Sequence, residues 1–166
     1  MNITGKALLL GDDVSSDLIY PGRYLTVTDR AEQARHALEG LGAGWPERLR
    51  GYTVLGAGWN LGCGSSREQA ATALLAAGVK LVIARSMSRL FMRNSINNGL
   101  PVIESDELAS ALTDGVTLSA DLARGVAQLE GRTFHFERLP QALLEIVRDG
   151  GLLARLRRTL ALETRP

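Results

Sequence analysis

The chain has 166 residues, of which 45% are hydrophobic and 22% charged, values typical of a globular domain and not of a disordered chain. Nineteen Lys and Arg against eighteen Asp and Glu leave a net charge of +1, so we expect neither a nucleic acid nor an anionic membrane as partner. A single cysteine excludes an internal disulfide, a CxxC zinc site and an iron–sulfur cluster held by this chain alone. No apolar run approaches the roughly 20 residues of a membrane span, and a reducing cytoplasm is the expected compartment.

The N-terminal third predicts one strand and one helix. Residues 6–10 are apolar and end at Gly11, as a short buried strand would. Asp29 and Glu32 have the spacing of a capping box, and alanines and leucines follow at helical intervals as far as Leu41. No repeat, low-complexity tract or long linker interrupts the chain, so we expect a single domain over residues 1–166.

Residues 53–103 alternate between strands and helices. Apolar runs at 53–55, 80–84 and 100–103 predict strands, and the segments between them have serines at their starts and glycines at their ends. The expected helices begin near Ser66, with Gln69 completing a capping box, and at Ser86. This order is typical of parallel strands joined by crossover helices.

The last third has a different pattern. Residues 126–129 and 133–136 flank a Glu-Gly-Arg turn and predict a hairpin, and Pro140 can begin a helix that reaches Val147. A final basic amphipathic helix should pack its leucines and leave Arg155, Arg157 and Arg158 in solvent.

The segment from Gly62 to Glu68, Gly-Cys-Gly-Ser-Ser-Arg-Glu, is the most informative for chemistry. Its glycines allow a ligand to approach the backbone, and the N-terminus of the following helix attracts anions. Ser65 and Ser66 add hydroxyls, and Arg67 adds a planar donor suited to a carboxylate. On chemistry alone, the segment is either an anion site or simply a well-capped helix.

Other catalytic motifs do not fit this sequence. The Gly-Lys-Ser/Thr of a P-loop is absent, and Gly64 stands where a nucleophile elbow needs serine. Cys63 would need His36 or His135 as a base, but these lie on a predicted helix and hairpin, so a buried filler is the favoured interpretation. Asp12, Asp13 and Asp17 can support a turn, and they are too few and too widely spaced for a metal site.

Three blocks of the sequence resemble small subunits of the aconitase superfamily, which include those of 3-isopropylmalate dehydratase and homoaconitase. The run GCGSSREQA at 62–70 is similar to the family's signature, and GDDVSSDLIYP at 11–21 is similar to its Asp-rich stretch. A third block runs from Ala84-Arg85-Ser86 through Arg93-Asn94 to Gly99-Leu100-Pro101. The blocks stand in family order over more than half of the chain.

The resemblance implies an α/β fold, namely a three-layer β/β/α swivelling domain of the aconitase small-subunit type. Such a domain closes over a large subunit that carries a [4Fe–4S] cluster, in a heterodimer or heterotetramer, and binds no cofactor or metal itself. Ser65 matches the serine that removes a proton from the substrate, and Asp17 matches an aspartate of the acid–base network. Ser66 and Arg67 match groups that hold a substrate carboxylate.

The resemblance also bears on the substrate. Relatives that act on tricarboxylates carry an Arg after Tyr-Leu, whereas here Thr26 and Val27 follow Tyr24-Leu25. A site without that charge rejects a buried carboxylate, so we expect a small dicarboxylate with an alkyl branch, 3-isopropylmalate first. Arg23 lies close enough in sequence to supply a positive charge and is a further candidate for substrate binding.

Four positions depart from the family pattern: Trp59, Leu61, Met87 and Ser88. They leave open a related hydro-lyase subunit acting on 2,3-dimethylmalate or homoaconitate. A non-catalytic carboxylate-binding regulatory module is the alternative from another class, and the retained Ser65 and Arg67 argue against it.

Overall fold

One mixed sheet forms the centre of the molecule. The computed structural model describes residues 1–65 and 67–163. In that part of the chain seven strands form a sheet in the order β4-β3-β2-β1-β5-β6-β7. The strands are β1 (Asn2–Leu9), β2 (Val54–Ala57), β3 (Leu81–Ala84), β4 (Val102–Glu104), β5 (Thr117–Asp121), β6 (Val126–Leu129) and β7 (Arg132–His135).

Strand β1 belongs to both halves of the sheet. Its later residues pair with β2 in parallel, and β2, β3 and β4 continue the parallel half, as the alternating sequence pattern predicts. Its earlier residues pair with β5 in antiparallel fashion, and β6 and β7 complete the antiparallel half as the expected hairpin.

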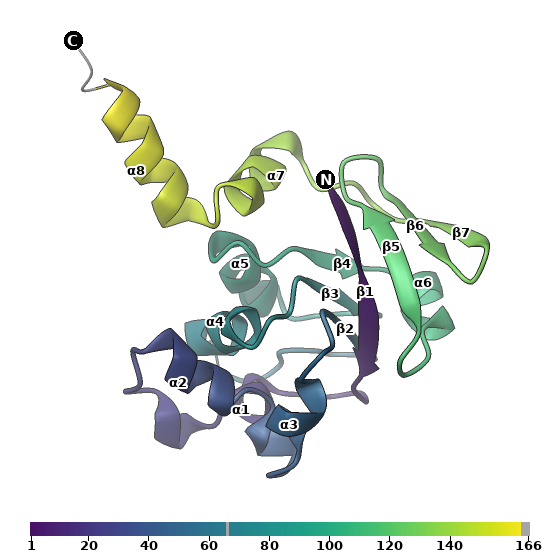
Figure 1. The fold of residues 1–166 in the computed structure, drawn as a ribbon, viewed down its shortest axis with the longest axis horizontal. Helices are drawn as coiled ribbons and strands as arrows, with labels where there is room; N and C mark the ends of the chain where they lie inside the picture. Colours follow the sequence, from purple (N-terminus) through teal and green to yellow (C-terminus); the bar gives the residue numbers. More distant parts are fainter. Residues whose placement is uncertain (66, 164–166) are drawn as a thin grey trace.

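The helices lie mainly on one side of the parallel half (Figure 1). Those named in the argument are α1 (Ser16–Ile19), α2 (Arg30–Arg35), α4 (Glu68–Ala76), α5 (Arg89–Asn97), α7 (Gln141–Arg148) and α8 (Leu152–Glu163). The others are α3 (Trp45–Leu49), α6 (Asp106–Ala111) and the 3-10 turns η1 (Gly22–Tyr24) and η2 (Glu39–Leu41).

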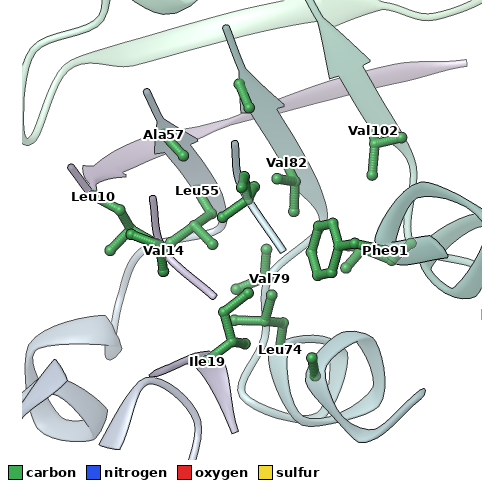
Figure 2. Close-up of a cluster of buried hydrophobic side chains, with 14 of the residues drawn as sticks. Leu10, Val14, Ile19, Leu55, Ala57, Leu74, Val79, Val82, Phe91 and Val102 are labelled. Atoms are coloured by element: carbon green, nitrogen blue, oxygen red, sulfur yellow. The ribbon is translucent and has the colours of Figure 1, made fainter. Parts of the chain in front are cut away.

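Every residue of β2 and β3 is buried. Since successive residues of a strand point to opposite sides, these parallel strands are covered on both faces. Leu8, Leu55, Val82 and Val102 are in register and belong to the core on the helix side. Figure 2 shows Leu55, Val82 and Val102 pointing toward the helices, where Leu74 and Phe91 lie. Val54, Leu81 and Ile83 face the other way and pack in a second core with Ala120, Ala127 and Phe134 of the antiparallel half. Helices, parallel half and antiparallel half therefore form the three layers expected of a β/β/α domain.

Helices α2 and α5 differ from their expected bounds. Asp29 caps α2 as predicted, accepting a hydrogen bond from the Glu32 amide, but the helix ends at Arg35. The chain then turns through Leu38, whose left-handed backbone (φ 65°) lets its amide bond the Ile19 carbonyl at 2.7 Å and buries its side chain. Helix α5 begins at Arg89 instead of Ser86, because Ser88 is the residue whose hydroxyl caps it.

The expectation for the last helix is wrong about which face packs. Helix α8 extends away from the body (Figure 1), with Leu153 69% and Leu156 48% exposed. Its inward face is polar: Arg155 pairs with Glu145 and Asp149, and Arg158 pairs with Asp149. The carboxylates of α7 and the turn after it attract Arg155 and Arg158, so Leu153, Leu156 and Leu160 face outward.

Candidate functional site

The loop between β2 and α4 is held in place by its backbone. The Gly62 amide donates to the Val14 carbonyl at 2.8 Å, and the Ser88 hydroxyl donates to the Gly62 carbonyl at 2.6 Å. Gly62 has a φ of 70°, and a Cβ there would lie 2.4 Å from the Cβ of Phe91. Only glycine fits this position, since a side chain would be both strained and in collision with α5.

Helix α1 is attached to the same loop. Ser15 caps it, accepting from the Leu18 amide at 3.3 Å. The Ser16 amide donates to the Cys63 carbonyl at 3.0 Å, and the buried Ser16 hydroxyl donates to the Ser65 carbonyl. These bonds bring Asp17, which lies next on α1, beside Ser65.

Arg67 joins the two segments. Its Nε donates to Ser65 Oγ at 3.1 Å, its Nη1 donates to the Tyr20 carbonyl at 3.2 Å, and its Nη2 forms an ion pair with Asp17. Ser65 Oγ lies 3.4 Å from Asp17 Oδ2. The Arg67 side chain is 16% exposed and that of Asp17 is 50% exposed. The cluster is therefore held by the largely buried Arg67 and is open to solvent on the side of Asp17.

This arrangement can favour loss of the Ser65 proton. The hydroxyl can donate to the Asp17 carboxylate, while the oxygen accepts a charge-assisted bond from Arg67. A guanidinium beside an oxygen stabilises the negative charge that develops when the proton leaves. The cluster can therefore serve as a base and, through Arg67, as an anion site.

The start of α4 differs from the prediction. The N-cap residue is Arg67, which has extended backbone and no capping side-chain bond, and the helix begins at Glu68. The guanidinium finds its acceptors on Ser65, Asp17 and Tyr20 instead. Gln69 does not reach back as in a capping box but donates to the Leu25 carbonyl at 3.3 Å. Ser66, the other expected carboxylate ligand, lies outside the described residues. At the other end, Gly78 follows the C-cap with a φ of 97°, as predicted.

The segment 21–28 runs beside the cluster but does not bring all its candidates to it. A Cβ on Gly22 would lie 3.1 Å from Arg67 Nη1, so this turn touches the guanidinium. Val27 is half-buried and lines a cavity of about 220 Å³ together with residues of α2 and α4, and Thr26 is exposed. Arg23 turns away and pairs with Glu39 at 2.5 Å.

Sequence reasoning missed Glu39 altogether. Its carboxylate accepts hydrogen bonds from Arg23 and from the Tyr24 hydroxyl, and it contacts His36 Nδ1. Burial raises the pKa of Glu39, but the bonds from His36, Arg23 and Tyr24 outweigh it and lower the pKa below its usual value. No motif marks such a residue; only the fold brings these groups together.

The positions that depart from the family pattern support the loop. Leu61 is buried and forms a parallel bridge with Met87. Ser88 caps α5 and also holds the Gly62 carbonyl. Trp59 is 41% exposed and lies under the Arg85 guanidinium at 4.7 Å.

The remaining candidates have structural surroundings. The Cys63 thiol donates weakly to the Asp13 carbonyl at 3.8 Å, whereas His36 contacts Glu32 and Glu39, and His135 lies on β7. Within residues 1–65 and 67–163, no group of three or more His, Cys, Asp or Glu side chains could hold a metal ion. In the same part of the chain, no helix has the length and apolarity to cross a membrane.

Comparison with known proteins shows the family to which the chain belongs. The family model of the aconitase C-terminal domain matches residues 13–107. The 3-isopropylmalate dehydratase small subunit 1 of Methanopyrus kandleri is 42% identical over 94% of this chain and 93% of its own length. The small subunit of Syntrophus aciditrophicus is 41% identical over 95% of this chain and 98% of its own.

A solved structure extends the likeness to three dimensions. The crystal structure of 3-isopropylmalate dehydratase from Methanocaldococcus jannaschii superimposes with a TM-score of 0.88 at 37% identity, covering 99% of this chain and 98% of that one. This chain therefore belongs to the aconitase C-terminal domain family, among the small subunits of 3-isopropylmalate dehydratase.

Proposed function

We propose that residues 1–166 form one swivelling domain, the small subunit of a two-subunit hydro-lyase that interconverts 2-isopropylmalate and 3-isopropylmalate in leucine biosynthesis. The observation that carries the proposal is the contact of Ser65 with both Asp17 and Arg67. The names of the relatives, at about 40% identity over most of the chain, supply the reaction. A regulatory module would have no use for a serine prepared in this way.

Ser65 is the proposed base. Its hydroxyl proton passes to Asp17, and the oxygen then takes the proton from the carbon next to the one that bears the hydroxyl. The hydroxyl leaves as water with the proton that Asp17 received, and water then adds to the neighbouring carbon by the reverse steps, so dehydration and rehydration together move the hydroxyl group. Arg67 and Ser66 hold a substrate carboxylate, with Arg67 steadying the oxygen of Ser65 through Nε.

The alkyl branch of the substrate is proposed to meet Val27 and Thr26. The support is the place of this segment beside Arg67 and the pairing of Arg23, the arginine within the turn, with Glu39. An apolar branch suits such a surface better than a third carboxylate does. Arg23 thus helps binding indirectly, by shaping the turn.

The partner is proposed to be a large subunit with a [4Fe–4S] cluster, joined in a heterodimer or heterotetramer in the cytoplasm. The cluster would supply Lewis-acid assistance to the departing hydroxyl. One cysteine in 166 residues cannot hold such a cluster, which supports its location on the partner.

Reconstitution tests the proposal. The purified chain should contain no iron and should not convert 2-isopropylmalate. Addition of a cluster-bearing large subunit should produce turnover, which is measured through the absorbance of the unsaturated intermediate. Turnover by the chain alone would contradict the two-subunit proposal. Binding to the large subunit without any turnover would favour the regulatory module.

A further inference from the structure

The carboxylate of Glu39 contacts three donor side chains, those of the neighbouring residues Arg23 and Tyr24 and that of His36. It accepts from Arg23 Nη2 at 2.5 Å and from the Tyr24 hydroxyl at 2.9 Å, and its second oxygen lies 2.5 Å from His36 Nδ1. The Tyr24 ring is stacked on the His36 ring at 3.6 Å and lies under the Arg23 guanidinium at 4.7 Å. Arg23, Tyr24 and His36 thus form one packed unit around a single negative charge.

Glu39 itself has a fixed position relative to the site. The preceding residue, Leu38, donates its amide to the Ile19 carbonyl on α1 at 2.7 Å. The following residue, Gly40, lies so close to α1 that a Cβ on it would be 2.5 Å from the Cα of Leu18. The turn that carries Glu39 is therefore anchored to the helix that carries Asp17.

The residues held by Glu39 continue directly into the substrate side of the cluster. The chain leads from Tyr20, whose carbonyl binds Arg67, through Gly22, which touches the Arg67 guanidinium, to Arg23 and Tyr24. The next carbonyl, that of Leu25, is bound by Gln69 at the start of α4. A change at Glu39 would reach this turn through two side chains.

We infer that Glu39 is a positioning residue that determines specificity: it neutralises Arg23 and fixes the turn at 22–25, so that Arg23 presents no free guanidinium beside Arg67. This inference rests on the proposed function. A released Arg23, 61% exposed even when paired, would be free to bind a further carboxylate on the ligand. On this inference, the site accepts a dicarboxylate with an alkyl branch because the Glu39 carboxylate already pairs with Arg23, so Arg23 does not bind a third carboxylate of the ligand.

The test uses the reconstituted enzyme and two competitive inhibitors, tricarballylate with three carboxylates and succinate with two. Glu39→Gln keeps the size of the side chain and removes its charge. We expect the ratio of the inhibition constants to shift toward tricarballylate by about fivefold, the effect of one partly exposed guanidinium gaining a carboxylate partner. The KM for isopropylmalate should rise more than kcat falls, because the turn is loosened while Ser65 is intact.

Two further variants separate this role from general damage. In Glu39→Gln with Arg23→Gln, the inhibitor ratio should return toward the wild-type value, because the released guanidinium is gone. Glu32→Gln is the matched control: Glu32 also contacts His36 and pairs with Arg35, but the contacts of Arg23 and Tyr24 are with Glu39. An unchanged ratio in Glu39→Gln, or a ratio that the second substitution does not reverse, would overturn the inference.

Nuclear magnetic resonance of the isolated chain tests the pairing of Arg23 with Glu39 without depending on catalysis. With labelled arginine, the Arg23 guanidinium should be rotationally restricted in the wild type and in Glu32→Gln, and should rotate freely in Glu39→Gln. Free rotation in the wild type would overturn the inference even in an active enzyme. Absence of isopropylmalate turnover by wild-type enzyme with restricted Arg23 would instead refute the proposed function.

Discussion

Ser65 lies between an acceptor and a donor, with Asp17 on one side and Arg67 on the other. A neutral serine is a poor base, so this environment is what makes the hydroxyl chemically useful. The Arg67 guanidinium is shared among Ser65, Asp17 and Tyr20, and each of these acceptors also restricts where it can move. The proposed base, Ser65, and the proposed anion binder, Arg67, are thus coupled in one small cluster.

Replacement of Ser65 by alanine should abolish most turnover and leave the fold intact. The side chain is exposed, and its loss should leave the backbone bonds of the loop in place. Loss of a positioned base costs about 10²–10⁴ in rate. Steady-state kinetics of the reconstituted enzyme check this, with Ser110→Ala, which removes another serine–aspartate bond on α6, as control. Retention of more than about a tenth of wild-type kcat would show that Ser65 is not the base.

Thr26 is the position at which a new charge should change specificity. Its side chain is exposed one residue beyond Leu25, whose carbonyl is tied to α4. Thr26→Arg should raise kcat/KM for a tricarboxylate such as homoaconitate and lower it for isopropylmalate, because a guanidinium would pair with the first and face an alkyl branch in the second. Thr113→Arg, an exposed site before β5, controls for net charge. Equal effects of the two variants on the ratio would place recognition elsewhere.

Among the elements, the glycine loop has the strictest steric requirements. Gly62 and Gly64 both have positive φ, but a Cβ on Gly62 would collide with Phe91, whereas the nearest atom to one on Gly64 is 3.7 Å away. Gly64→Ala should lower the free energy of unfolding by about 1–2 kcal/mol, the strain of a left-handed residue. Gly62→Ala should lower it by more, since α5 must also shift. Urea denaturation measures both, and equal losses would contradict the steric argument.

Asp114 links β1 to α3. It accepts from the Leu9 amide at 2.9 Å and pairs with Arg48 of α3 at 3.1 Å. The bond from Leu9 lowers the pKa of this carboxyl; burial opposes the shift, and Arg48 adds to it. Because the folded-state pKa is lower, the stabilisation is complete above the unfolded value of about 3.9 and is lost as pH falls through the folded value.

The corresponding experiment compares the acid side of two unfolding profiles. Asp114→Asn should be less stable at neutral pH and should lose less of its remaining free energy of unfolding below about pH 4. Denaturation of both proteins between neutral and acid pH measures the slopes. Parallel slopes would mean that Asp114 contributes nothing to the acid transition.

Local patterns predicted the elements whose signals lie within a few residues. Asp29 caps α2, Gly78 follows α4, and the strands of the parallel half lie close to their expected positions. Elements β5 and α6 were not predicted. Strand β5 depends on pairing with β1, which is distant in sequence, whereas α6 has a local capping signal at Ser105 that sequence reasoning missed. The start of α4 was misplaced because Arg67 bonds to groups 47 and 50 residues earlier, which no window can include.

The candidate site was predicted only as far as its residues can be recognised by type. Asp17, Ser65 and Arg67 were named in advance, and the structure brings all three into contact. The direction of Arg23 was not predictable, since its partner Glu39 is fixed by the contact of a later turn with α1. Long-range packing decides which charges remain available.

At the scale of the whole molecule, the parallel half of the sheet has the firmest support. It is covered by helices on one face and by the antiparallel half on the other. Both segments of the candidate cluster extend from this half: α1 follows β1, and the glycine loop follows β2. The candidate site is thereby built on the best-buried strands, which suits the proposed closure against a large subunit.

Helix α8 is held differently from the sheet. Its contacts with α7 include ion pairs, and Leu153, Leu156 and Leu160 face away from the body. Gly150 and Gly151, both with positive φ, form the turn that precedes it, and Gly151 packs so closely on the end of α5 that a Cβ there would lie 2.7 Å from the Asn97 carbonyl oxygen. The screening length falls from about 10 Å at 0.1 M salt to about 3 Å at 1 M, so salt should loosen α8 long before it affects the sheet. Amide hydrogen exchange should therefore accelerate with salt in α8 and remain constant in β1–β3, and Asp149→Asn should reproduce the effect at low salt. Uniform exchange at all salt concentrations would contradict this.

Ionic strength would then control how firmly α8 is held against α7, whereas the shape of the rest of the molecule would not depend on it.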